Sequence, residues 1–253
     1  MFTSNPFAAL SSFISPVAMQ TYVLLMVVLV AGGTLFDIAH KGSAKYFFDN
    51  WRKSRGRRGA KQVGAGEFVS IAVQTAVVDV LASGEFCNAR RRIAHLLGMY
   101  GFVLYVVSTV VMVFDALASA IWAQLWWIGG LMVCVGGYWF WFFIRVDVAA
   151  EGNSPFRVVK ADLFILSLLA SVTLGLIWVA AGGGANVLFG LYVLATTVLF
   201  AGVPWSKFAH MFFKPAAAFE KRVSYANETR SNLPAPADKP EQFGKAPKHA
   251  QHY

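Results

Sequence analysis

The stretch Ile93–Phe114, IAHLLGMYGFVLYVVSTVVMVF, decides the fold class of this 253-residue chain. It contains no lysine, arginine, aspartate or glutamate. A helix of this length crosses the hydrocarbon core of a bilayer, which is about 30 Å thick, at about 1.5 Å per residue. Similar apolar runs recur along the chain, which is 57% hydrophobic and 14% charged. The composition therefore predicts an integral membrane protein rather than a soluble domain.

Four further apolar runs predict membrane-spanning helices, so we expect an all-helical protein with five spans. These runs are Val17–Ala39, Ile121–Ile144, Ala161–Ala181 and Asn186 to about Phe213. Segment 67–82 is too short to span and predicts an interfacial helix between the first and second spans. Residues 1–16 form an outside N-terminal segment ahead of the five-helix membrane domain, 17–223. The polar, proline-rich segment 224–253 predicts a disordered cytoplasmic tail.

The basic residues predict the topology. With five spans and an outside N-terminus, all 22 lysines and arginines fall on the cytoplasmic side. The formal charge of +9 is therefore explained by orientation in a membrane, and nucleic-acid binding is not indicated. The basic cytoplasmic loop 41–66 predicts a surface that docks a soluble partner or touches anionic membrane lipids.

Two local patterns describe the predicted outer ends of the spans. Trp122, Trp126 and Trp127 are expected to be interface anchors at the outer end of the third span. The run Gly182–Gly184 predicts a tight turn between the fourth and fifth spans.

Three histidines occur at the inner ends of predicted spans: His40, His95 and His210. Ionisable side chains in membrane helices are costly unless partnered, so each is a candidate functional residue. Two neutral imidazoles on different helices can ligate one haem iron, and His95 and His210 have matched depths on long helices. The alternative is that these histidines are interfacial polar residues that reach lipid headgroups.

The surroundings of His95 and His210 favour haem ligation. Gly98 and Gly101 follow His95 at spacings of three, which predicts room for a flat macrocycle on one helix face. Basic side chains within about one turn are expected to pair with haem propionates: Arg90, Arg91, Arg92 and Lys207. Cys87 and Cys134 lie far apart and predict neither a zinc site nor an iron–sulfur cluster.

Carboxylates supply further candidate residues. Asp37 and His40 have a spacing of three, so they can share a helix face and accept protons from a quinol, or simply support packing. Gln74 and Asp79 in the interfacial segment could line a quinone headgroup pocket, although a polar stripe that faces water explains them equally.

Two segments resemble helices of a known family. RRRIAHLLGMYGFVLYVVSTVVMVF (Arg90–Phe114) and GVPWSKFAHMFFKP (Gly202–Pro215) are similar to the second and fifth helices of the nitrate reductase gamma-subunit-like cytochromes b. The resemblance is closer to the membrane subunit of the quinone-interacting oxidoreductase complex and to the membrane anchor of adenylylsulfate reductase. It covers about 200 residues, and PWSKFAHMFF is its most specific motif.

The resemblance implies one b-type haem ligated by His95 and His210, with a quinone or quinol site beside it. Nitrate reductase-type subunits hold a second haem through further histidines of the same two helices, where this chain has Tyr105 and Tyr192. The resemblance therefore implies that the second haem is absent. Without cysteine clusters, a separate cytoplasmic protein with flavin or iron–sulfur centres must be the redox partner, and adenylylsulfate reductase is expected.

These inferences combine into an electron-transfer subunit in a bacterial inner membrane. We expect it to anchor a cytoplasmic oxidoreductase of sulfur metabolism and to pass electrons between that enzyme and the quinone pool. The alternative is a redox-inactive scaffold that only tethers the enzyme. A small-solute transporter is disfavoured by the odd span count and by the lack of inverted halves.

Overall fold

A computed structural model describes residues 2–40, 45, 48, 49, 52, 61–84, 86, 88–145, 158, 162–203 and 210–227. For residues 210–213 it describes the backbone only. Its elements in chain order are η1 (Ala8–Ser12), α1 (Pro16–His40), α3 (Ala65–Gln74), the π-helical η2 (Thr75–Leu81), α4 (Ala89–Phe114), α5 (Ala120–Trp139), the π-helical η3 (Phe140–Ile144), α7 (Leu163–Ala180), α8 (Val187–Ala201) and α9 (His210–Ala226). No strand occurs in these ranges, so the all-helical prediction is confirmed for them.

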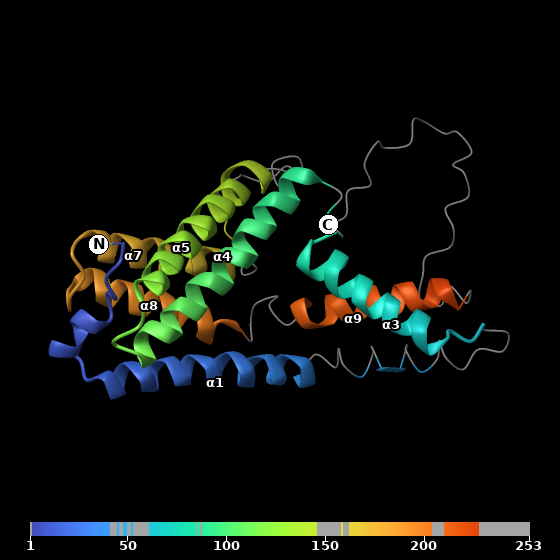
Figure 1. Ribbon diagram of the computed structural model, residues 1–253, viewed down its shortest axis with the longest axis horizontal. Coiled ribbons are helices and arrows are strands. Elements are labelled where there is room, and N and C mark those ends of the chain that lie inside the picture. Colours follow the sequence, from blue (N-terminus) through green and yellow to red (C-terminus); the bar gives the residue numbers. More distant parts are fainter. Residues whose placement is uncertain are drawn as a thin grey trace.

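Four helices are long and apolar enough to cross a membrane: α1, α4, α5 with η3, and α7. They match the first four predicted spans to within a few residues, and they make this a multi-pass membrane protein in composition and length. Helix α8 is apolar but has only 15 residues. In Figure 1, α1 runs along one side of the bundle formed by α4, α5, α7 and α8.

The fifth predicted span is wrong in its inner half. The sequence predicted one helix from Asn186 to about Phe213, whereas α8 ends at Ala201 and α9 begins at His210. The backbone turns at Gly202 and Val203, and residue 204 is a proline. Because a proline disfavours helical geometry in the residue before it, Val203 is a natural end for the helix.

Glycines bring α4 and α5 into close contact. A Cβ at Gly101 would lie 2.8 Å from the carbonyl oxygen of Gly129, and one at Gly129 would lie 2.7 Å from that of Gly101. Gly136 meets the backbone of Ala94 in the same way, at 2.7 Å. Small residues that let backbones approach are the usual basis of helix association in membranes. This seam fixes α4 against α5.

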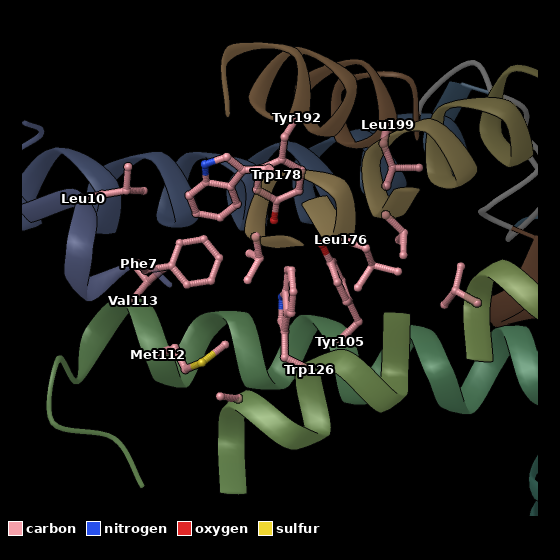
Figure 2. Close-up of a cluster of buried hydrophobic side chains, with 14 of the residues drawn as sticks. Phe7, Leu10, Tyr105, Met112, Val113, Trp126, Leu176, Trp178, Tyr192 and Leu199 are labelled. Carbon is pink, nitrogen blue, oxygen red and sulfur yellow. The ribbon is translucent and has the colours of Figure 1, made fainter. Parts of the chain in front are cut away.

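An aromatic cluster fills the centre of the bundle (Figure 2). The Tyr105 ring stacks on Trp126 with centroids 4.9 Å apart, and Tyr192 stacks on Trp178 at 5.9 Å. Trp126 is fully buried and donates from Nε1 to Thr109 Oγ1 at 3.0 Å. The prediction of an interface anchor is therefore wrong for Trp126, because its helix turns that face toward α4.

The turn between α7 and α8 follows the glycine prediction. Gly182, Gly183 and Gly184 all have positive φ, between 70° and 97°, which a side chain would strain. Trp178 Nε1 donates to the Gly184 carbonyl at 2.8 Å, and the Asn186 side chain accepts from Phe189 N. The chain therefore reverses its direction within a short turn, and α8 packs against α7.

A second, more polar unit consists of α3, η2 and α9, which lie beside one another apart from the main bundle (Figure 1). Its helical segment 65–81 confirms the predicted helix between the first two spans. Helix α9 runs to Ala226 and so includes the first three residues of the predicted tail, of which Ser224 is only 1% exposed. Residues 228–253 and most of the basic loop 41–66 lie outside the described residues.

Candidate functional site

His95 lies in the second turn of α4, next to the turn that follows η2. Its Nδ1 is 3.0 Å from Ser83 Oγ, a hydrogen-bond distance, and its ring is 4.8 Å from that of Phe86. The imidazole is exposed, whereas Ser83 is only 1% exposed. When Nε2 of a histidine binds a metal, Nδ1 carries the proton and a neighbouring acceptor fixes the ring orientation. Ser83 is placed to be that acceptor.

The backbone at Ser83 is held in an unusual conformation. Its φ of 49° lies in the left-handed region, where residues other than glycine are uncommon. Gly84 N donates to the Val78 carbonyl at 2.7 Å, which closes the turn at the end of η2. Such conformations persist where surrounding contacts enforce them, and they cluster at functional sites. The sequence offered only the dipeptide Ser83-Gly84 as a turn signal, and Ser83 was missed as a site residue.

The two glycines predicted to make room beside His95 differ in their surroundings. A Cβ built at Gly98 meets no heavy atom within 4 Å, so the space beside it is open. Gly101 instead packs against Gly129 and Met132 of α5. The prediction that Gly101 frees space for a macrocycle is therefore wrong, because α5 occupies that space. The role of Gly98 beside a haem stays a prediction.

Two side chains of α4 near His95, Arg92 and Tyr100, donate hydrogen bonds to the end of η2. Arg92 Nε donates to the Ala82 carbonyl at 2.7 Å, and Tyr100 Oη donates to the Leu81 carbonyl at 2.7 Å. These bonds satisfy carbonyls at the C-terminal end of η2, which have no partner within the helix. Arg91 is half-buried. Lys214 of α9 lies over the Phe86 ring at 5.7 Å, so a further cation approaches this turn.

His210 is the first residue of α9 rather than a residue in the last turn of α8. The prediction that His210 lies in the last turn of the fifth span is therefore wrong. The side chain of His210 and the whole of Lys207 lie outside the described residues. Within the described ranges no three His, Cys, Asp or Glu side chains converge as ligands for a metal ion. A site with two axial histidines needs no such group.

Helix α9 is tied to η2 by a bidentate ion pair. Arg222 Nε donates to Asp79 Oδ2 at 2.9 Å, and its second nitrogen donates to Oδ1 at 3.1 Å. This bond raises the pKa of Arg222 further above its ordinary value. The Phe68 and Phe219 rings meet edge to face at 4.9 Å on the same interface. Asp79 thus positions α9 and is not a free headgroup ligand, and Arg222 was missed because nothing in the local pattern marks it.

Asp37 and His40 end α1 with different surroundings. Asp37 is only 4% exposed, whereas His40 is exposed and stacks on Phe36 with centroids 5.5 Å apart and planes 7° apart. Asp37 and His40 therefore do not lie together on one exposed face of α1.

Tyr105 and Tyr192, the two tyrosines that the sequence analysis singled out on the second and fifth predicted spans, both lie in the central cluster. Their side chains are 5% and 6% exposed, and their hydroxyls point toward each other in Figure 2. Their rings pack on Trp126 and Trp178 within the central cluster. Aromatic side chains therefore fill the bundle at this depth.

No protein-family model, curated protein or solved structure matches the chain. Functional conclusions therefore depend on the geometry described above and on the sequence motifs.

Proposed function

We propose that this protein is a membrane anchor and electron-transfer subunit that links the quinone pool to a cytoplasmic oxidoreductase. The single observation that carries the proposal is the hydrogen-bond contact between His95 Nδ1 and buried Ser83 Oγ at 3.0 Å. When Nε2 of an imidazole binds a metal, a hydrogen bond at Nδ1 holds the ring in the orientation that Nε2 needs. Nothing in the packing of an interfacial histidine would require it.

The proposal includes five membrane crossings with an outside N-terminus. Helix α9 binds η2 through Arg222 and Asp79, so both lie on one side of the bundle. In the chain, η2 precedes α4 and α9 follows α8. The helices α4, α5, α7 and α8 must therefore cross the membrane an even number of times in total to return α9 to the side where η2 lies. Helix α8 is about 22 Å long at 1.5 Å per residue, shorter than the core of about 30 Å, and local bilayer thinning accommodates such a mismatch.

The unit of α3, η2 and α9 then lies at the cytoplasmic membrane surface. A stripe of exposed apolar residues at spacings of four follows α3 and η2, namely Val69, Val73, Val77 and Leu81, each at least half exposed. The opposite face buries Ile71 and Thr75. An amphipathic helix of this kind lies in the interface with its apolar stripe among lipid chains.

His95 and His210 would hold the iron of one b-type haem, and the described residues around His95 fit such a group. The exposed imidazole is oriented by Ser83, and the space beside Gly98 is open. The bound haem supplies reversible one-electron chemistry. Arg91, Arg92 and Lys207 are the proposed propionate partners, and Arg92 Nε also donates to the Ala82 carbonyl. The packed Tyr105 and Tyr192 rings support a single haem rather than two.

The roles of the remaining residues follow from their positions. Asp37 and His40 are the proposed proton acceptors for a quinol at the inner end of α1. The basic loop 41–66 is the proposed docking surface for the soluble flavin or iron–sulfur partner. Adenylylsulfate reductase as that partner, and a bacterial inner membrane as the location, are supported by the sequence resemblance alone.

The test is a reduced-minus-oxidised visible spectrum of the purified protein after haem-replete expression. We expect a b-type α band and one haem per chain, lost in His95→Ala and in His210→Ala. His249→Ala, in the polar tail, is the matched control and should retain the haem. A wild-type protein that folds and binds a soluble partner without any haem band would contradict electron transfer and leave the scaffold function.

Docking is tested separately by reversing the charges of the lysines and arginines in loop 41–66. We expect co-purification of the soluble oxidoreductase to be lost while haem content is unchanged. Retained co-purification would show that the loop only contacts lipid.

A further inference from the structure

A long cavity of about 880 Å³ separates α1 from α4, α7 and α8. Along α1 its lining extends from Ala18 to Ile38, about 30 Å at 1.5 Å per residue. The cavity is partly enclosed by the helices and partly open at their outer surface. That surface lies among lipid chains, because α1, α4 and α7 have the length and composition of membrane-crossing helices. The cavity is therefore open to lipid rather than to water.

Helix α1 packs loosely on the bundle along this cavity. Only three of its 25 residues are buried, namely Met26, Thr34 and Asp37, whereas nine of the 18 residues of α7 are buried. Tyr22 Oη donates to the Val193 carbonyl at 3.1 Å and ties the N-terminal half of α1 to α8. Farther along α1, apolar walls face each other across open space. Such a void is unfavourable when empty, because the atoms that line it lack contact partners.

The cavity is too narrow for a helix. A volume of 880 Å³ spread over about 30 Å gives a mean cross-section of about 30 Å². An α-helix with its side chains is about 10–12 Å in diameter, so its cross-section is at least about 80 Å². A membrane helix of a partner protein or of a second copy therefore does not fit, whereas flexible hydrocarbon chains do.

The cavity wall offers no polar group to an occupant. None of the described residues that line it is a lysine, arginine, histidine, aspartate or glutamate, so a charged headgroup would lack a partner inside. Tyr22 Oη and Thr197 Oγ1 are 2.9 Å apart, and the Tyr105 hydroxyl hydrogen-bonds with the Tyr192 side chain. The Thr34 hydroxyl oxygen is buried and has no surface on the cavity. The part of an occupant inside the cavity is thus hydrocarbon.

The two ends of the cavity differ in what covers them. Phe7 and Ile14, from the segment that precedes α1, line one end, and Phe7 is held there by its contact with the Trp178 ring at 5.7 Å. The other end is lined by Ile38 of α1 and by Val203, which follows α8. Helix α1 ends two residues after Ile38. A headgroup can therefore lie beyond this second end, at the membrane surface.

We infer that the cavity holds the acyl chains of a phospholipid from the leaflet in which α1 ends, and that these chains join α1 to the bundle. In the proposed topology this is the cytoplasmic leaflet, but the site depends neither on that topology nor on haem. The chains restore the dispersion contacts that the facing walls lack. Because protein surrounds them on more than one side, they exchange more slowly than lipid on the outer surface of the bundle.

The experiment uses the full chain in nanodiscs of phosphatidylcholine that include a phosphatidylcholine with a photoreactive diazirine in its acyl chain. Adducts are mapped by peptide mass spectrometry, and lipid retained after transfer to detergent is counted by native mass spectrometry. Val30→Trp fills the cavity from α1, and Val106→Trp fills it from α4. Val28→Trp and Val103→Trp are the matched controls, since both valines are exposed on the same helices and do not line the cavity.

We expect the wild type to retain phospholipid in detergent and to carry adducts on the cavity-lining residues of α1 and α8. Both signals should fall about tenfold or more in Val30→Trp and in Val106→Trp, because a buried ring and a lipid chain cannot share one volume. They should be unchanged in both controls. The two filling variants act from different helices, so the one that folds decides the outcome if the other does not.

Three results would overturn the inference. A wild type that retains no phospholipid in detergent has no site that holds lipid. Equal retention and labelling in the filling variants and in their controls would place the lipid on the outer surface of the bundle. Loss of the cavity adducts when decylubiquinone is added at the same concentration as the labelled phospholipid would assign the cavity to a neutral prenyl lipid instead.

Discussion

Removal of the Ser83 hydroxyl gives the sharpest test of the candidate site. In Ser83→Ala the contact of 3.0 Å between Oγ and His95 Nδ1 is lost, while the backbone keeps its positive φ. A hydrogen bond donated by Nδ1 makes the imidazole a stronger electron donor and favours the ferric state. Its loss should therefore raise the midpoint potential of the haem. A net hydrogen bond of about 0.5–1.5 kcal/mol corresponds to about 20–65 mV for one electron.

The assay is a spectroelectrochemical titration of the α band in detergent. Ser108→Ala is the matched control, because Ser108 lies on the same helix α4, is fully buried and has no hydrogen-bond partner among the described residues. Its potential should equal that of the wild type. Ser83→Gly should shift the potential as Ser83→Ala does but unfold at a higher temperature, because glycine adopts a φ of 49° without strain. An unchanged potential with full haem retention in Ser83→Ala would refute the role of Ser83.

Three further predictions concern packing and charge. Gly101→Ala should destabilise the detergent-solubilised protein by about 1–3 kcal/mol through overpacking against α5, whereas Gly98→Ala should be neutral in thermal unfolding; equal effects would contradict the seam described here. Asp79→Asn and Arg222→Gln should each loosen α9, and a double-mutant cycle should give a coupling of at most about 1 kcal/mol because the pair is partly exposed. Since the pKa of Arg222 is raised by its hydrogen bonds to Asp79, its contribution to stability is fully present at neutral and moderately alkaline pH and is lost only when the pH rises into the range where an arginine deprotonates. Protease sensitivity of α9 should accordingly stay constant from about pH 7 to pH 10, and a rise in that interval would refute the assignment.

The apolar spans were predictable because hydropathy is a local property. The boundaries of Ile93–Phe114 and Ile121–Ile144 agree with α4 and with α5 plus η3 to within a few residues. The end of α8 was missed although Pro204 marks it, because hydrophobicity continues past the proline in the sequence. Composition indicates where a helix is stable in lipid, and it does not indicate where the backbone turns.

The site itself was predicted only in part because its geometry depends on tertiary contacts. His95 was identifiable as an imidazole in an apolar helix, but Gly101 and Trp126 face α5 and α4 for reasons that depend on how those two helices are rotated. A periodic pattern shows which residues share a face and leaves open what that face contacts. Ser83 and Arg222 carry no local signal, since each acts on a residue of another helix.

The position of Ser83 is itself set by α4, the helix that carries His95. Arg92 and Tyr100 lie on either side of His95 in the sequence, and they bind the carbonyls of Ala82 and Leu81, the two residues that precede Ser83. These carbonyls end η2 and need donors from outside the helix. Helix α4 therefore supplies both the imidazole and the two anchors that hold its hydrogen-bond partner in a strained turn. Because all three contacts come from α4, the orientation of His95 and the shape of the turn at Ser83 are set by the same helix.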